Sequence, residues 1–160
     1  MNYTNLKVLL DSTYILPSFG IEVEGISDEH LIQLRQARIK GKIKFYCSPV
    51  VWVEILGKVY RESKRLKINV EDVVEIAVTS LLESGFYEWI QPSSNSIILA
   101  FKLRMLGHKD NIDNILYAIS KTNNLIFLTM DDEFKEFLSK HGHKTNNLID
   151  HISLLNKLKK

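Results

Sequence analysis

Short apolar runs alternate with stretches of helical apolar spacing along most of the sequence. The runs predict strands at residues 6–10, 42–47, 86–90, 125–128 and, at one edge, 143–148. Apolar residues that recur every three or four positions predict helices at 27–40, 50–64, 70–84, 94–106, 110–121, 132–140 and from 150 onward. Strands that alternate with helices are typical of an α/β domain. We therefore expect a three-layer α/β/α sandwich with a mainly parallel central sheet.

Residues at the element ends refine this prediction. Three helices have a polar residue suited to cap their first turn: Ser48, Asn69, and Ser94 or Asn95. Pro17 disfavours helix at the residue before it, Leu16. The helix at 50–64 is expected to bury one face, which consists of Trp52, Ile55, Leu56 and Val59.

The composition is that of an ordinary globular protein. The chain has 160 residues, 45% of them hydrophobic and 25% charged, which suits one domain spanning residues 1–160. No apolar run reaches the ~18 residues that a membrane helix needs, and the start of the sequence lacks the pattern of a signal peptide. Cys47 is the only cysteine, so we expect a small buried thiol and a cytoplasmic protein without a disulfide framework.

Charge is distributed unevenly, although the net charge is only +2. Residues 1–34 carry one lysine and five acids, whereas residues 35–67 carry ten basic residues and two acids. Such a local excess of positive charge is typical of a surface that binds a polyanion such as nucleic acid. A solvated, lysine-rich surface explains the same pattern, and charge alone leaves both interpretations open.

Acidic residues stand where expected strands end and where helices begin. Asp11 and Asp131 directly follow two of the apolar runs. Asp110 and Asp113 open the helix that precedes the second of those runs, and Glu54 lies one turn into another helix. Because the carboxyl ends of parallel strands meet at one edge of a sheet, four segments can deliver carboxylates to one site there.

Each acid also has a purely structural explanation. Asp110 could be a helix N-cap with Asp113 in the first turn, and Asp131 could cap the next helix. Glu54 lies among apolar neighbours, where an ion pair with an arginine would account for it. Asp11 is harder to explain in this way, because an unpaired carboxylate directly after a buried strand is costly.

A cluster of carboxylates needs a cation to offset its mutual repulsion. Oxygen ligands without a Cys/His pattern favour Mg²⁺ or Mn²⁺, and such an ion can activate water for attack on a phosphodiester. Basic residues beside the cluster would then hold a nucleic-acid backbone. The candidates for this contact are Lys42, Lys44, Lys58 and Arg61.

Four segments resemble, in order and spacing, the acidic motifs of PIN-domain ribonucleases, a family that includes the VapC-type toxins. They are the VLLDS segment that contains Asp11, Glu54 early in a helix, the DNILYA segment that begins at Asp113, and the LTMD segment that ends at Asp131. The resemblance covers essentially the whole chain. It implies a parallel α/β/α sandwich that cleaves RNA with Mg²⁺ or Mn²⁺, and it implies that these four acids are catalytic and bind the metal.

The resemblance also implies supporting roles around the four acids. Ser12 and Thr129 match positions that hydrogen-bond the catalytic carboxylates. Asp110 is not one of the four acids and is expected to support the site from outside it. Many members of the family have Asn where this chain has Thr13, and this departure would loosen the hydrogen bonding around Asp11.

The function implied by the resemblance is that of a metal-dependent endoribonuclease, the toxin of a toxin–antitoxin pair. Its expected partners are RNA, an antitoxin protein and a second copy of the chain in a homodimer, with no membrane. Two alternatives remain open: a degenerate PIN-like module that binds RNA or protein without cutting it, and an RNA-processing nuclease that has no antitoxin. An aspartyl-phosphate phosphatase built on Asp11 is disfavoured, because such enzymes usually carry a second Asp where this chain has Thr13.

Other residues with chemical potential have simpler explanations. His141 and His143 have no third metal ligand nearby in the sequence and are expected in a solvated loop. Aromatic residues that could stack on bases have the spacing of core residues: Trp52, Phe86, Tyr87 and Trp89. Tyr14, just past Asp11, is the aromatic side chain that we least expect in the core.

Overall fold

One sheet of five parallel strands organises the computed structural model, which describes residues 5–160. The strands are β1 (Leu6–Leu10), β2 (Ile43–Cys47), β3 (Tyr87–Trp89), β4 (Ile126–Leu128) and β5 (Leu148–Ile149). Their order across the sheet is β3-β2-β1-β4-β5, and every neighbouring pair is parallel. The mainly parallel sheet predicted from the sequence is confirmed.

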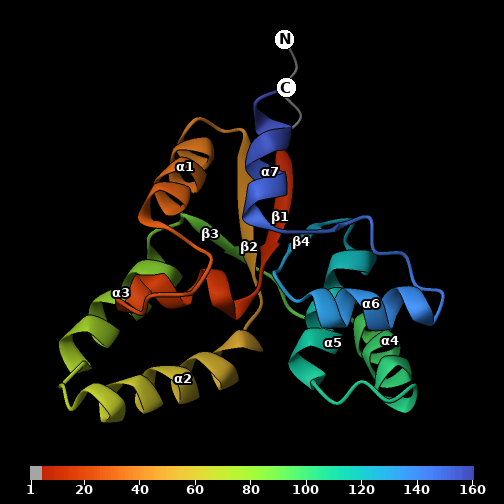
Figure 1. The fold of residues 1–160 in the computed structure, drawn as a ribbon, viewed down its shortest axis with the longest axis horizontal. Coiled ribbons are helices and arrows are strands. Elements are labelled where there is room, and N and C mark those ends of the chain that lie inside the picture. Colours follow the sequence, from red (N-terminus) through yellow and green to blue (C-terminus); the bar gives the residue numbers. More distant parts are fainter. Residues whose placement is uncertain (1–4) are drawn as a thin grey trace.

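Helices cover both faces of this sheet. Two 3₁₀ helices, η1 (Ser12–Tyr14) and η2 (Leu16–Phe19), follow β1. The α-helices are α1 (Asp28–Ile39), α2 (Val51–Leu66), α3 (Glu71–Glu83), α4 (Ser94–Met105), α5 (Asn111–Thr122), α6 (Asp132–Lys140) and α7 (His151–Leu158). Figure 1 shows α1, α2 and α3 on one side of the strands and α4, α5 and α6 on the other, while α7 contacts α1. Right-handed crossovers explain this division, because the chain moves outward from β1 to β3 and then returns past β1 to β4 and β5.

β1 is the central strand, and its second half is fully covered. Val8, Leu9 and Leu10 are buried, with β2 on one side of the strand and β4 on the other. Leu10 pairs with Leu128, so β1 and β4 end side by side. The direction of the crossovers reverses between these two strands, and open α/β sheets place their sites at such a switch point.

The structure corrects the predicted elements in two places. The strand expected at 143–148 is shorter and later in the structure, where β5 consists of Leu148 and Ile149. The residues before it form a turn instead, in which the N–H of Leu148 donates to the carbonyl of Thr145 (3.0 Å). A 3₁₀ helix begins at Leu16, although Pro17 disfavours helix there. Proline is tolerated in a first helical turn, where its missing N–H would have no helical partner.

The predicted helix caps agree with the structure only in part. The N-cap position of α3 is Val70, one residue after the predicted Asn69, although the Asn69 side chain does accept a hydrogen bond from the N–H of Glu71, the first residue of the helix (2.9 Å). The cap of α4 is Ser93, one residue before the predicted Ser94 or Asn95. Both serines and the asparagine are suited to this role, so composition alone does not select among neighbouring positions.

Ser48 does not cap α2, contrary to the prediction. Its hydroxyl is buried and has no hydrogen-bond partner among the described residues. The N–H of Val51 bonds instead to the backbone carbonyl of Ser48 (3.1 Å). The helix therefore begins through a backbone turn, and the hydroxyl is left unsatisfied.

α2 is covered on a narrower face than its sequence predicts. Ile55 and Val59 are buried and Trp52 is half-buried, as predicted, but Leu56 is 56% exposed. The helix projects from the sheet, as Figure 1 shows, so only a stripe of it meets the rest of the chain.

Across the described residues, no helix combines the length and hydropathy needed to cross a bilayer.

Tyr14 belongs to the core, which corrects the expectation that it lies outside. Its side chain is 7% exposed and its hydroxyl oxygen accepts a hydrogen bond from the N–H of His151 (3.2 Å). The same hydroxyl lies 2.9 Å from Nδ1 of the buried His151 ring. α7 therefore supplies a polar partner that lets Tyr14 be buried. The other aromatic residues that were predicted to belong to the core do pack against it: Trp52, Phe86, Tyr87 and Trp89.

The buried hydroxyl of Ser48 predicts an unusual response to a small substitution. Ser48→Ala removes a desolvated group that has no partner, so the free energy of unfolding should be unchanged or increased by up to about 1 kcal/mol. Denaturant unfolding measures this change. The matched control is Ser120→Ala, because the buried Ser120 hydroxyl donates to the carbonyl of Tyr117 (2.6 Å). It should cost about 1–3 kcal/mol. Equal losses in the two variants would contradict this account of Ser48.

Candidate acidic cleft

An acidic cleft lies at the carboxyl ends of β1 and β4. Its volume is about 300 Å³, and its lining residues are Asp11, Thr13, Glu54, Lys58, Asp110, Asp113, Met130 and Asp131. These residues come from four separate segments: the end of β1, α2, the start of α5 and the end of β4. The structure thus brings all five candidate acids to one place, at the switch point of the sheet.

Asp11 is held in place by hydroxyl groups. It is buried, and its two carboxylate oxygens accept hydrogen bonds from Ser12 (3.5 Å) and Thr129 (3.2 Å). The Thr129 hydroxyl oxygen also accepts from the backbone N–H of Asp131 (3.2 Å). One threonine therefore links the two acids that end neighbouring strands.

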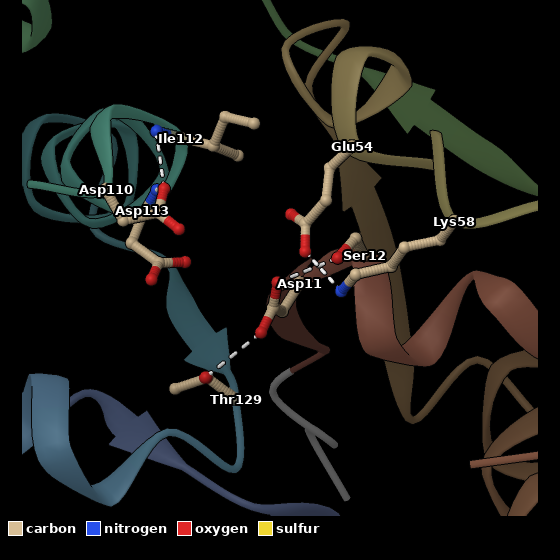
Figure 2. A network of polar contacts seen from close by, with 8 residues as sticks. All are labelled: Asp11, Ser12, Glu54, Lys58, Asp110, Ile112, Asp113 and Thr129. Carbon is tan, nitrogen blue, oxygen red and sulfur yellow. Dashed lines mark hydrogen bonds and ion pairs between the residues drawn. The ribbon is translucent and has the colours of Figure 1, made fainter. Parts of the chain in front are cut away.

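Asp110 and Asp131 are helix caps as well as cleft residues. Asp110 accepts hydrogen bonds from the N–H groups of Ile112 (2.9 Å) and Asp113 (3.1 Å) at the start of α5, as Figure 2 shows. Asp131 accepts from the N–H of Phe134 (2.8 Å) at the start of α6. The capping explanation of both acids is confirmed. The caps fix the two carboxylates at the cleft and place them at positive helix ends.

Asp113 is the acid with the strongest electrostatic perturbation. Its half-buried carboxylate points from α5 toward Asp11 in Figure 2. Burial, and then the charges of the neighbouring acids, of which Asp11 contributes most, raise the pKa of Asp113 to about 8. Burial and the charge of Glu54 raise the pKa of Asp11 to about 6, against its hydrogen bonds and the charge of Lys58. The acids thus repel one another, and a cation among them would relieve this repulsion.

Glu54 is paired with a lysine of its own helix. Its carboxylate forms an ion pair with the ammonium of Lys58, four residues later in α2, and this corrects the expected arginine partner. The two side chains are 23% and 35% exposed, so the pair is partly withdrawn from water. Glu54 is less buried than its apolar neighbours in the sequence suggest, because the adjacent Val53 is mostly exposed.

The four basic candidates divide between the two ends of the sheet. Lys58 lines the acidic cleft, and Arg61 follows it on the next turn of α2. Lys42 precedes β2 at the opposite edge, where its ammonium bonds to the carbonyl of Leu158 (3.5 Å). Lys44, early in β2, pairs with Glu88 (3.1 Å). Of the four, only Lys58 lines the cleft itself.

The donor set of the cleft fits a hard divalent cation that keeps part of its water shell. Within residues 5–160, no three Asp, Glu, His or Cys side chains lie close enough together to hold an ion directly. Mg²⁺ is usually bound by one or two carboxylates, with water and phosphate oxygens as its other ligands. Asp113 meets this requirement best, because its raised pKa reports an uncompensated carboxylate. Asp11, Glu54 and Asp131 face the same cleft and could complete the set.

Sequence reasoning missed how several residues shape this cleft. The Glu54–Lys58 spacing of four residues on a helix is a recognisable signal for an ion pair. The role of Asn114 had no such signal: it is fully buried, donates to the carbonyl of His108 (3.0 Å) and lies 2.8 Å from the ring Nδ1 of His108. These contacts fix the loop that carries Asp110.

Comparison with known proteins identifies the fold. No protein-family model and no curated protein matches the chain. VapBC2 from Rickettsia felis, bound to a DNA fragment from its promoter, is 17% identical with a TM-score of 0.57, over 90% of this chain and 96% of that chain. A toxin–antitoxin complex from Klebsiella pneumoniae is 14% identical with a TM-score of 0.53, over 90% of this chain and 97% of that chain.

A third match is VapC20 of Mycobacterium tuberculosis, a toxin that cleaves the sarcin–ricin loop. It is 12% identical with a TM-score of 0.52, over 81% of this chain and 93% of that chain. At these identities the likeness concerns the fold. The chain has the fold of VapC-type toxins, and the PIN-like architecture predicted from the sequence is confirmed.

The raised pKa values predict that the metal-free protein loses stability as pH rises. Above the ordinary carboxyl pKa of 3.8 the unfolded chain releases protons that Asp11 and Asp113 retain in the fold. Their contribution to stability is therefore full at low pH and is lost as pH rises through about 6 and about 8. Melting temperatures in chelator should fall over this range. Asp113→Asn should flatten the fall above pH ~6, and equal slopes in both proteins would refute the assignment.

Proposed function

We propose that this chain is a metal-dependent endoribonuclease of the cytoplasm that cleaves RNA phosphodiester bonds, and that it is the toxin of a toxin–antitoxin pair. The observation that carries the proposal is the cleft at the switch point, where four segments bring together five carboxylates. Two of these carboxylates, Asp11 and Asp113, have raised pKa values. The fold adds support, since one protein that shares it cleaves the sarcin–ricin loop. On this proposal residues 1–160 form a single PIN-like domain.

The proposed catalytic and metal-binding residues are Asp11, Glu54, Asp113 and Asp131. A bound Mg²⁺ or Mn²⁺ would supply an activated water and would neutralise charge on the phosphate. Ser12 and Thr129 orient Asp11 by donating hydrogen bonds to its carboxylate, and so limit the positions it can take. Asp110 supports the site by fixing the first turn of α5, from which Asp113 projects.

Lys58 and Arg61 are the proposed contacts to the RNA backbone. Lys58 lies inside the cleft and Arg61 is exposed one turn further along α2. Phosphate contacts of this kind hold a strand without reading its sequence. The choice of RNA would then depend on other surfaces around the cleft.

Two alternatives lead to different observations. A degenerate module would bind RNA without cutting it, and the presence of all four acids argues against this. An RNA-processing nuclease would share the chemistry but would have no antitoxin. A short open reading frame for a DNA-binding antitoxin directly upstream would favour the toxin, and its absence would favour RNA processing.

An antitoxin partner is supported by a cavity on the face of the sheet that α1 and α3 cover. The cavity measures about 430 Å³ and lies between η2, α1, α3 and the strands. Its walls include the apolar side chains of Leu31, Ile76 and Phe86 together with Arg35. An apolar segment that carries one acid would fill the cavity and pair with Arg35. This is our proposal for the contact made by an antitoxin.

A second copy of the chain is the proposed partner of α4. The helix is apolar on both sides: Ala100 and Leu103 are buried, while Ile97, Ile98, Phe101 and Met105 form an outer stripe that is 47–73% exposed. An outer apolar stripe opposite the core-facing side of a helix is normally covered by a partner. At about 200 Å² for each large side chain, the stripe offers roughly 450 Å², against about 800 Å² per partner in a stable dimer. Other residues beside the stripe would have to supply the remainder.

The catalytic assignment predicts that Asp113→Asn abolishes metal-dependent cleavage without unfolding the protein. Cleavage of a mixed RNA substrate with Mn²⁺ or Mg²⁺ should fall at least ~100-fold. Thermal stability at neutral pH should be equal or higher, because the substitution removes a carboxylate that its neighbours disfavour. Gel analysis of labelled RNA measures the first effect and melting curves measure the second.

The matched control is Asp132→Asn, one residue beyond the cleft. Asp132 is exposed in the first turn of α6 and does not line the cleft, so cleavage should be retained. Full activity in Asp113→Asn would remove the catalytic assignment. Loss of both folding and activity would instead favour a structural role for this acid.

The proposed homodimer predicts that a charge on the outer stripe of α4 separates the two copies. Phe101→Glu should convert a dimer to a species of the monomer mass of 18.5 kDa, because an unpaired carboxylate would be buried at the interface. Sedimentation equilibrium measures the mass. Ile39→Glu is the control, since Ile39 is equally exposed on α1 but lies away from this stripe. A wild-type chain that is monomeric at high concentration would contradict the proposal.

A further inference from the structure

Lys58 is the only base among the described residues that line the acidic cleft. Five acids face it there: Asp11, Glu54, Asp110, Asp113 and Asp131. Its ammonium is bound to Glu54, which precedes it by four residues in α2. A glutamate placed one turn before a lysine is the favourable order for such a pair on a helix.

The surroundings of this pair differ from those of the other ion pairs in the described chain. Lys44–Glu88 is more exposed and lies outside the cleft, and Arg65–Glu62 lies on the surface of α2. Figure 2 shows the ammonium of Lys58 and the carboxylate of Glu54 pointing toward Asp11. The charge of Lys58 lowers the pKa of Asp11, while the charge of Glu54 raises it. Lys58 thus offsets part of the negative charge of the cleft.

A carboxylate that binds this ammonium is restricted in binding a metal ion. Glu54 has two oxygens, and any ligand position it offers to a cation competes with the charge-assisted hydrogen bond from Lys58. A divalent cation placed beside Lys58 would also be repelled by the ammonium. When an ion binds to Glu54, the ion pair therefore either opens or remains closed at the cost of repulsion between the ion and the ammonium.

We propose that Lys58 is a positioning residue: its ammonium serves as an internal counter-cation for the Glu54 carboxylate. When the divalent metal ion binds, it takes the place of the ammonium at Glu54. The exchange rests on the proposed metal-dependent function of the cleft. In the metal-free protein the ammonium reduces repulsion among the acids. On loading, the metal replaces it at Glu54, so the strength of the pair sets the metal concentration at which the cleft fills.

The test is Mn²⁺ binding measured by calorimetry on four proteins: wild type, Lys58→Met, Glu54→Gln and the double variant. Met keeps the length of the side chain and removes its charge. Lys58→Met should raise the Mn²⁺ affinity about two- to fivefold, which is the range expected for a pair of this exposure. In the Glu54→Gln background the same substitution should give a clearly smaller gain, because the competing pair is already absent and only the direct repulsion by the ammonium is left to remove. Lys44→Met, which breaks the pair outside the cleft, should leave the affinity unchanged.

Melting curves supply a second readout that does not depend on activity. In chelator, Lys58→Met should melt below wild type, and saturating Mn²⁺ should remove the difference. An equal gain in affinity with and without Glu54 would overturn the exchange, since Lys58 would then act only as a nearby charge. An unchanged affinity in Lys58→Met would overturn it as well. If the wild type cleaves RNA and binds Mn²⁺, either result leaves the proposed function intact, whereas a wild type that binds no Mn²⁺ overturns both.

Discussion

The pairing of β1 with β4 is the constraint on which the cleft depends. It joins segments that lie more than a hundred residues apart, and it sets Leu10 beside Leu128. The backbone N–H of Asp11 continues the ladder by donating to the carbonyl of Leu128 (3.2 Å). One residue later the strands diverge toward opposite faces of the sheet. The cleft beside this point is lined by Asp11 and Asp131, which follow the two strands. A slip in the pairing would remove the hydrogen bond that Thr129 donates to Asp11.

The cost of gathering like charges is distributed over the fold. Asp110 and Asp131 are stabilised by the helix starts that they cap, and Asp11 by two hydroxyl groups. Glu54 is compensated by its lysine. Asp113 accepts no side-chain hydrogen bond and forms no ion pair within residues 5–160, and its pKa is raised further than that of Asp11. The acid with the fewest partners of its own is therefore the one whose charge depends most on an added cation.

The sequence predicts the acids better than it predicts their partners. Runs such as residues 6–10 and the helical stripe after Asp110 indicate a parallel sheet, and parallel topology alone places the strand ends at one edge. Tyr14 was misjudged because its partner, His151, is 137 residues away and leaves no local pattern. Ser48 resembles an N-cap in composition, yet a backbone turn satisfies the helix instead. Features that depend on neighbouring residues can therefore be predicted from the sequence, whereas contacts between residues that are distant in the sequence cannot.

The distribution of charge over the folded chain also changes how the basic segment is interpreted. Residues 35–67 are strongly basic, but Lys42 and Lys44 lie at the end of the sheet opposite the cleft, and Lys58 faces acids. The cleft itself is therefore acidic, and a phosphate backbone that approached it alone would be repelled. Under the proposed function, electrostatics then imposes an order in which a divalent cation reverses the local charge before RNA engages. Of the basic residues in this segment, only Lys58 lines the cleft, so most of what looks like a polyanion footprint in the sequence lies elsewhere on the folded chain.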